Sequence, residues 1–280
     1  LVMSQTYLRR QTTAWNFFVA RWSRLYPLHF LTLMFVAALQ WRSYALFGHF
    51  QIYPANDLYH FVLHFFFISG WGLAQGWAYN APIWSVSLEI AIYACFYAFL
   101  PIIRASSGVC VIAFLASVFG ILCLLGVGGL FVECAAYFSL GTLVHSAMGS
   151  RRAMAVLMGL SIVCLSSAFL LELGISFKVY GFVFLLLVLV SGLDAWGQGA
   201  LQMKPVSKLG DAVYASYLLH IPFQILAILC IDGLGLDRIG LVSTHAFFFF
   251  FMGGTIGVSL MVFRWVEMPL QRFFRTRLSC

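Results

Sequence analysis

The sequence predicts an all-α protein, a polytopic bundle of membrane-spanning helices. Hydrophobic residues fill 62% of its 280 positions and charged residues only 9%, whereas a soluble domain carries about 25% charged residues. The 29 Phe, 12 Tyr and 8 Trp suit a chain whose aromatic rings face lipid and anchor at the membrane interface. The composition therefore excludes an ordinary soluble domain.

Eight apolar runs are long enough to cross a bilayer, because a crossing helix needs about 17–25 residues. They cover residues 25–45, 83–103, 109–129, 130–148, 153–172, 176–193, 211–231 and 239–265. A ninth run, 58–71, is too short to cross, and we expect it to re-enter the membrane or to lie on its outer face. The sequence thus predicts eight full spans and one re-entrant or interfacial segment, with no separate soluble domain.

The basic residues set the orientation. The formal net charge is +7, from 16 Lys and Arg against 9 Asp and Glu, and the basic residues lie in short loops between the apolar runs. Such loops are cytoplasmic, so both ends of the chain are expected in the cytoplasm, which requires that 58–71 does not cross. No basic face follows a phosphate backbone, so nucleic-acid binding is not expected. Seven scattered Cys residues without a Cys-x-x-Cys motif predict neither a metal site nor a disulfide framework.

One segment carries a carboxylate into an apolar run. Glu89 would lie roughly 9 Å inside the helix that begins near Ile83, and a charge at that depth costs on the order of 2.5 kcal/mol or more. Ser85, Glu89 and Tyr93 share one helix face, and Asn80 is predicted to cap the helix. The pattern favours a polar stripe along a cavity, with Glu89 as a base, an orienting group or a proton carrier. A structural pair with an Arg or His of another helix is the alternative.

Two further segments place polar groups in or beside spans. His220 follows Tyr217 by one turn, and Pro222 removes a backbone hydrogen bond beside it. A histidine in a span is a candidate acid–base group, and a hydrogen bond to an adjacent helix is the alternative. Arg21 and Arg24, expected in a basic loop before a span, could clamp a phosphate through their planar guanidinium groups. The alternative is anchoring at the cytoplasmic face.

Together these segments resemble the membrane-bound acyltransferase 3 family, whose members O-acylate sugars. The matching residues, in chain order, are Arg21–Pro27, Asn80 with Trp84–Glu89, Leu209–Gly210 with Tyr214–His220, and Val266–Pro269. The resemblance covers essentially the whole chain and implies about ten helices. The family's Arg-x10-His and Phe-Phe-x-x-Ser-Gly elements have no counterpart here, so we expect residues 1–276 to form a single acyltransferase-3-like domain without its first one or two helices. Residues 277–280 would be a cytoplasmic tail.

The resemblance implies that an acyl group, most often acetyl, passes from acyl-CoA to a carbohydrate hydroxyl of a cell-surface or exported glycan, in a bacterial inner membrane. It assigns Arg21 and Arg24 to acyl-CoA, and the catalytic cavity to Glu89 with Ser85 and His220. No metal is implied. The alternative function is a transporter or flippase of an acyl donor or lipid-linked glycan, in which Glu89 and His220 would carry protons. A chain without activity is a third interpretation.

Overall fold

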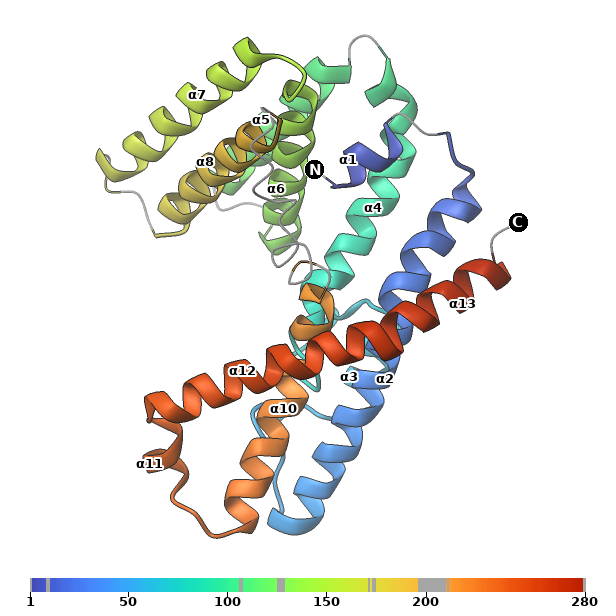
Figure 1. Ribbon diagram of the computed structural model, residues 1–280, viewed down its shortest axis with the longest axis vertical. Coiled ribbons are helices and arrows are strands. Elements are labelled where there is room, and N and C mark those ends of the chain that lie inside the picture. Colours follow the sequence, from blue (N-terminus) through green and yellow to red (C-terminus); the bar gives the residue numbers. More distant parts are fainter. Residues whose placement is uncertain are drawn as a thin grey trace. The chain divides into compact units, whose positions relative to one another are not determined.

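In the computed structural model of residues 1–280, the regular secondary structure of the described part is helical (Figure 1). The described residues are 2–8, 11–105, 108–124, 129–170, 172, 175–195, 210 and 212–278. No strand occurs among them, which confirms the predicted all-α class.

Six helices in the described chain are long and apolar enough to cross a membrane. They are α2 (Ala14–Phe47), α4 (Ile83–Arg104), α6 (Gly129–Ala147), α7 (Arg151–Leu170), α10 (Val213–Gly233), and the run of α12 (His245–Val262), η3 (Phe263–Glu267) and α13 (Met268–Leu278). Two more helices, α5 (Gly108–Leu124) and α8 (Ile175–Ala195), contain shorter apolar stretches. Each predicted span overlaps one of these helices, and the number of crossings stays a prediction.

The apolar run 58–71 is not a single helix. α3 (Leu58–Phe65) has eight residues and is about 12 Å long, less than half of the roughly 30 Å hydrocarbon thickness. The chain then turns and continues in η1 (Ser69–Leu73), a short π-helical segment with non-helical backbone angles at Gly72. This geometry fits the predicted re-entrant or interfacial segment.

The predicted loop around Arg21 and Arg24 was wrong, because this stretch is helical. α2 begins much earlier than the apolar run, after Thr13, whose hydroxyl accepts a hydrogen bond from the backbone N–H of Asn16 (3.2 Å). The helix then continues through Pro27. A hydropathy pattern finds the apolar part of a helix and misses a polar first half, whereas a capping residue marks the true start.

The predicted span 239–265 also had a wrong boundary. The chain forms the short helix α11 (Arg238–Val242) and then breaks at Ser243–Thr244. There the Thr244 hydroxyl accepts a hydrogen bond from the backbone N–H of Phe247 (3.2 Å) and caps α12. A capping residue near the start of an apolar run therefore divides it into two helices.

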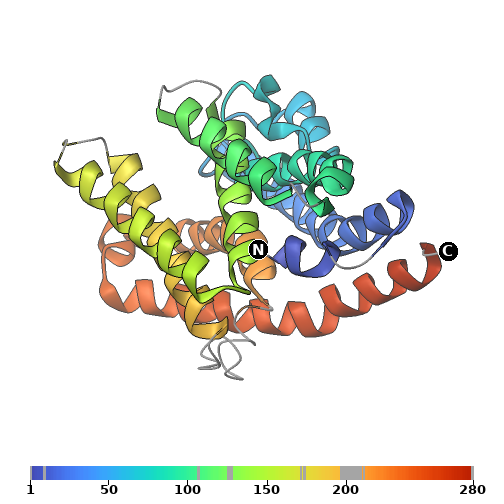
Figure 2. The ribbon, with the colours of Figure 1, turned by 90° about the horizontal axis from the view of Figure 1, so that it is seen from above.

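The described chain forms two compact units, and the first comprises Leu1–Thr12 and Ala91–Val206. It holds α1 (Val2–Tyr7), most of α4, and α5 to α8. Helix α5 packs on α6, and α7 packs on α8. The α7–α8 pair is visible in Figure 2. The guanidinium of Arg104 donates to the carbonyl oxygen of Tyr7 (2.7 Å) and ties α1 to α4. A buried cluster joins α6, α7 and α8 through Val144, Ala147, Met154, Leu157 and Val188.

The second unit comprises Thr13–Ile90 and Ser207–Cys280. Helix α10 packs along α2, and α13 packs along another part of α2. Figures 1 and 2 both show α12 and α13 as one continuous run. The core consists of Leu33 and Val36 from α2, Ile221 and Ile225 from α10, and Ala78 and Tyr79 from the loop before α4. A single domain over residues 1–276 stays a prediction.

Candidate functional site

The first turn of α10 bonds to both α2 and the start of α4 within the second unit. The Tyr214 hydroxyl donates to the carbonyl oxygen of Leu25 on α2 (2.6 Å). One turn later, the Tyr217 hydroxyl donates to the carbonyl oxygen of Pro82 and shares a hydrogen bond with Ser85 Oγ (2.7 Å). Either hydroxyl can be the donor in the second bond, because Ser85 Oγ also lies 3.4 Å from the carbonyl oxygen of Pro82 and can donate to it. One face of α10 thus holds two segments that are far apart in the sequence.

Asn80 does not cap α4, so this prediction was wrong. Asn80 is fully buried, and its Nδ2 donates to the carbonyl oxygen of Leu218 on α10 (2.9 Å). Within a helix, that carbonyl would accept from the N–H four residues later, but residue 222 is proline and has none. Asn80 therefore supplies the hydrogen bond that Pro222 removes, and it fixes the loop before α4 on α10.

Charged groups from three elements act on the buried hydroxyl of Tyr214. Glu267 of η3, Glu89 of α4 and Arg24 of α2 all lie within electrostatic range of it. Glu267 is buried, Glu89 is half-buried and Arg24 is exposed. The structure therefore brings the predicted Glu89 and Arg24 near the same phenol. It adds Glu267, which belongs to the Val266–Pro269 segment.

The segment η1 lies against the first turns of α4. The Gly70 N–H donates to Ser87 Oγ (2.9 Å), and the Trp71 indole N–H donates to the carbonyl oxygen of Ser87 (3.1 Å). A Cβ on Gly70 would lie 2.3 Å from the carbonyl oxygen of Trp84, so the backbones approach this closely only because residue 70 is glycine. These contacts position the part of α4 that carries the predicted serine and glutamate.

The remaining predicted site residues are His220 on α10 and Arg21 and Arg24 on α2. His220 is half-buried, with its ring 6.0 Å from the Tyr217 ring, and its side chain forms no hydrogen bond to another described residue. Arg21 is half-buried and Arg24 exposed on α2. The catalytic roles of Ser85, Glu89 and His220 and the donor-binding role of the two arginines stay predictions.

Two buried histidines of this unit were missed by the sequence reasoning. His29 of α2 and His64 of α3 are 0% and 3% exposed. The ring Nε2 of His29 lies 2.9 Å from the carbonyl oxygen of His64. A signal was present, because His29 follows Leu25 by four residues and Arg21 by eight and thus shares their face of α2.

Side-chain hydrogen bonds hold the segment from Asp57 to Tyr79. The Asp57 carboxylate caps α3 by accepting from the backbone N–H and from Nδ1 of His60 (2.8 Å each), and these bonds lower the pKa of Asp57 below its ordinary value. The Tyr59 hydroxyl donates to the carbonyl oxygen of Leu73 (2.9 Å). The Tyr79 hydroxyl donates to the carbonyl oxygen of Asp57 (3.1 Å). These hydrogen bonds therefore join residues at the two ends and in the interior of the segment.

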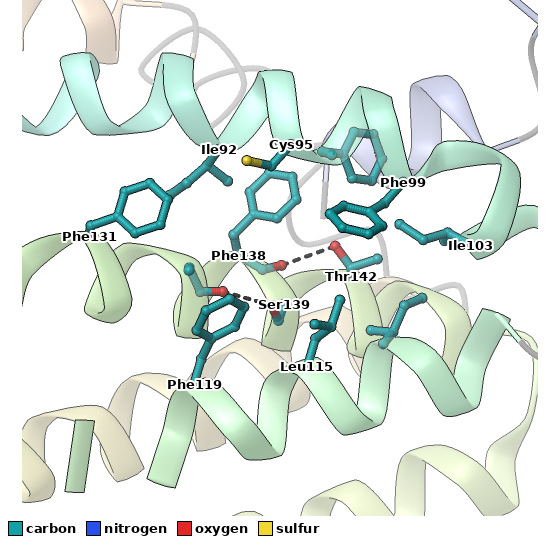
Figure 3. A pocket seen from close by; sticks show the side chains of 13 residues that line it. Ile92, Cys95, Phe99, Ile103, Leu115, Phe119, Phe131, Phe138, Ser139 and Thr142 are labelled. Atoms are coloured by element: carbon teal, nitrogen blue, oxygen red, sulfur yellow. Dashed lines mark hydrogen bonds between the residues drawn. The ribbon is translucent and has the colours of Figure 1, made fainter. Parts of the chain in front are cut away.

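A separate groove lies in the first unit, between α4, α5 and α6 (Figure 3). Its cavity volume is about 140 Å³, and Phe and Ile side chains form most of its wall. Two hydroxyls reach it, but Thr142 donates to the carbonyl oxygen of Phe138 (3.0 Å) and Ser139 to that of Ala135 (2.7 Å). The groove therefore offers a largely hydrocarbon surface, with the thiol of Cys95 as its one titratable group.

Comparison with known proteins gives one match. A family model described as an acyltransferase domain matches residues 1–264. The match includes the Arg21–Pro27, Asn80–Glu89 and Tyr214–His220 segments and ends just before Val266. No curated protein and no solved structure matches the chain. Among the described residues, no group of three or more His, Cys, Asp or Glu side chains could hold a metal ion.

Proposed function

Because this chain belongs to the acyltransferase 3 family, we propose that it is a membrane-bound O-acyltransferase acting on glycans. It moves an acyl group, most often acetyl, from acyl-CoA to a carbohydrate hydroxyl of a cell-surface or exported glycan. Residues 1–276 act as one domain in a bacterial inner membrane, with both ends of this chain in the cytoplasm.

The observation that carries the proposal is the meeting of the family's polar segments in one unit. Ser85 is bonded to Tyr217, and Glu89, Arg24 and Glu267 lie within electrostatic range of Tyr214. Ionisable groups in membrane helices usually face one another or a wet cavity, and they mark functional sites. Acyl transfer to a hydroxyl needs a proton acceptor and polar groups that stabilise the charge developing on the carbonyl oxygen.

The donor is proposed to bind near Arg21 and Arg24. Helix α13 supports this assignment, since it packs along the same part of α2: the Trp15 indole N–H donates to the carbonyl oxygen of Leu278 (2.7 Å), and the Trp22 ring lies edge-on to Phe274 (5.2 Å). Both arginines are at or near this paired stretch. Helix α13 adds three further basic side chains, Arg272, Arg275 and Arg277. Guanidinium groups bind phosphate in a bidentate manner, and coenzyme A carries several phosphates.

Within the proposed cavity, Glu89 orients or charge-stabilises the group that takes the proton from the acceptor. The Ser85 oxygen is bonded to Tyr217 and has two lone pairs, so it can also accept a hydrogen bond from the hydroxyl of the sugar. His220, beside the Tyr217 ring, is a supporting polar group. The sugar enters from the outer face, which the 46–82 region borders.

The proposal is tested with the purified chain in liposomes, with acetyl-CoA as donor and a panel of methyl glycosides as acceptors. Release of free thiol and formation of acetylated glycoside, measured by mass spectrometry, are the expected products. Glu89→Gln should lower kcat by about 100-fold or more, because a group that orients or stabilises a proton transfer contributes on that scale. Arg42→Gln is the control, since Arg42 is exposed on the same helix as Arg21, 21 residues further along the chain.

The products of this experiment distinguish an acyltransferase from a transporter. Acetylated glycoside formed by the wild type and lost in Glu89→Gln supports the enzyme. Movement of acetyl-CoA or a lipid-linked glycan across the liposome, without any acetylated product, would instead establish the transporter. Normal turnover by Glu89→Gln would remove Glu89 from the site while leaving the reaction in place.

A further inference from the structure

A second groove lies in the second unit, between α10, α11 and α12. These three helices follow one another along the chain and pack together (Figure 1). The cavity volume is about 580 Å³, within the range of about 300–1,000 Å³ that small-molecule sites have. Most of the wall is apolar, and it includes Ile228 and Ile231 of α10, Ile239 of α11, and Phe247 and Phe251 of α12. The groove therefore has room for a hydrocarbon ligand.

The polar side chains of this groove are unevenly distributed. Arg238 and Ser243 line it at α11, beyond the last residue of α10, whereas Gln224 is the polar residue on the α10 wall. The α10 wall runs from Ile231 back to Gln224, about 10 Å along the helix axis. A charged side chain is costly in hydrocarbon, so the Arg238 end lies at the membrane interface and the apolar part extends into the bilayer. This order of polar and apolar parts is that of a membrane lipid.

Arg238 presents hydrogen-bond donors at the polar end of the groove. Its Nε donates to one carboxylate oxygen of Asp232 (3.0 Å), and one Nη donates to the other. A guanidinium has five N–H donors, and this pair uses two of them. Arg238 forms no other hydrogen bond within the described part of the chain. The edge between its two Nη atoms can therefore bind an oxyanion in a bidentate manner, and Asp232 fixes the direction of that edge.

The charges around Arg238 favour a ligand head that carries both signs. Residues 232–244 contain two carboxylates, Asp232 and Asp237, and one cation, Arg238, so their charges sum to −1. Asp237 is exposed and caps α11 by accepting from the backbone N–H of Ile239 (3.1 Å). A phosphate on Arg238 adds negative charge to this turn, and an ammonium group on the same ligand offsets it by pairing with a carboxylate. A phosphate and an amine on one head group therefore match the turn.

The groove is continuous with the apolar outer surface of these helices. No residue of α11, all of which the structure describes, is buried. Ile239 is 83% exposed and Phe248 is 55% exposed, and both also line the groove. In a membrane-spanning chain such apolar surface faces the lipid chains. A lipid can therefore enter this groove from the side, out of the bilayer.

We propose that this groove binds a phospholipid with a phosphoethanolamine head. One acyl chain lies along α10 and α12, the phosphate binds the Nη edge of Arg238, and the ammonium group pairs with Asp237. The lipid is a structural partner and not a substrate, so the site is independent of acyl transfer. It fastens the end of α10 to α11 and α12, while the other end of α10 carries Tyr214 and Tyr217 of the candidate site.

The test is native mass spectrometry of the purified chain, titrated with phosphatidylethanolamine, phosphatidylglycerol or phosphatidylcholine that carry identical acyl chains. Wild-type protein should bind phosphatidylethanolamine about tenfold more tightly than either other lipid. Arg238→Gln should weaken this binding about tenfold or more, because a hydrogen bond to a charged group contributes on that scale. Ala227→Phe fills the apolar part of the groove without changing a charge, and it should weaken the binding of all three lipids. Arg42→Gln, at an exposed arginine of α2, is the control and should bind as the wild type does.

Thermal unfolding in detergent gives a second reading and shows whether each variant folds. Phosphatidylethanolamine at about 100 times its Kd should raise the melting temperature of the wild type by about 5 °C or more. It should raise that of Ala227→Phe and Arg238→Gln much less. Equal affinity of the wild type for the three lipids, or wild-type affinity in both groove variants, would overturn the proposal. So would a lipid-free dimer in the mass spectra whose groove is filled by a second copy of the chain. Neither measurement involves turnover, so a chain without acyl transfer would leave this site standing.

Discussion

Gly70 gives the sharpest test of the packing that positions the start of α4. A methyl group at this residue would lie 2.3 Å from the carbonyl oxygen of Trp84 and 2.4 Å from Ser87 Oγ. Real Cβ contacts are essentially never shorter than 3.0 Å, so η1 and α4 would have to separate by about 0.7 Å (3.0 minus 2.3). The Trp84 oxygen belongs to the backbone, and it can move only if the helix moves.

The expected cost has two parts. Forcing an extra methyl group into a packed contact costs about 1–3 kcal/mol. Separating the segments also lengthens the bond between the Gly70 N–H and Ser87 Oγ, and a buried donor without a partner costs about 1–3 kcal/mol. Gly70→Ala should therefore destabilise the protein by about 2–6 kcal/mol. At about 2–4 °C per kcal/mol, the melting temperature would fall by about 4–24 °C.

The assay is thermal unfolding of purified protein in detergent, followed by tryptophan fluorescence, with acyl transfer measured on the same samples. The matched control is Gly120→Ala in α5, where a Cβ would meet nothing within 4 Å. This control should be neutral or more stable by about 0.5–1 kcal/mol, because alanine is the better helix former. If Gly70→Ala melts with the control or above it, the close approach of η1 to α4 is not part of the native fold.

Two further outcomes follow from charge and pH. Replacing Arg21 and Arg24 together with Gln should raise the KM for acetyl-CoA about tenfold and leave the KM for the acceptor unchanged. An unchanged KM for acetyl-CoA would mean that both residues only anchor the chain at the membrane. The Asp57 carboxyl has a lowered pKa in the folded protein. Its stabilising contribution is therefore present above the ordinary carboxyl pKa of about 4 and is lost as the pH falls through the lower folded value. The gain is under about 1 kcal/mol because Asp57 is exposed. Asp57→Asn should keep the cap and lose this dependence, so a melting temperature that follows pH identically in both proteins would contradict the assignment.

The lengths of the apolar runs predicted which segments are helical and how they are distributed along the chain, because a crossing helix must be apolar over most of its length. This prediction was wrong where the helix and the apolar run have different ends. The first half of α2 carries Arg21 and Arg24 and is too polar to register as a span, yet the Thr13 cap extends the helix to it. The Thr244 cap has the opposite effect and interrupts an apolar run. Capping residues carried the missing information in both cases.

Only part of the candidate site could be predicted from the sequence. The reason applies to buried polar groups in any membrane protein. A polar side chain in an apolar run must find a partner, so Ser85 and Glu89 could be singled out without a structure. The partners could not be found in that way, because many of them are backbone carbonyls, which every residue has. Three polar side chains, Tyr214, Asn80 and His29, end on carbonyl oxygens of other elements.

One of these carbonyls was nevertheless predictable in principle. Pro222 leaves the carbonyl oxygen of Leu218 without its helical donor, so the sequence requires some buried N–H to take that place. The amide that does so, Asn80, lies 138 residues earlier. The carbonyl of His64, in the last turn of α3, differs, because it accepts from the backbone N–H of Phe67 (3.1 Å) as well as from the His29 ring. A sequence thus shows where a helix has an unsatisfied carbonyl, and the fold decides which distant side chain is drawn to it.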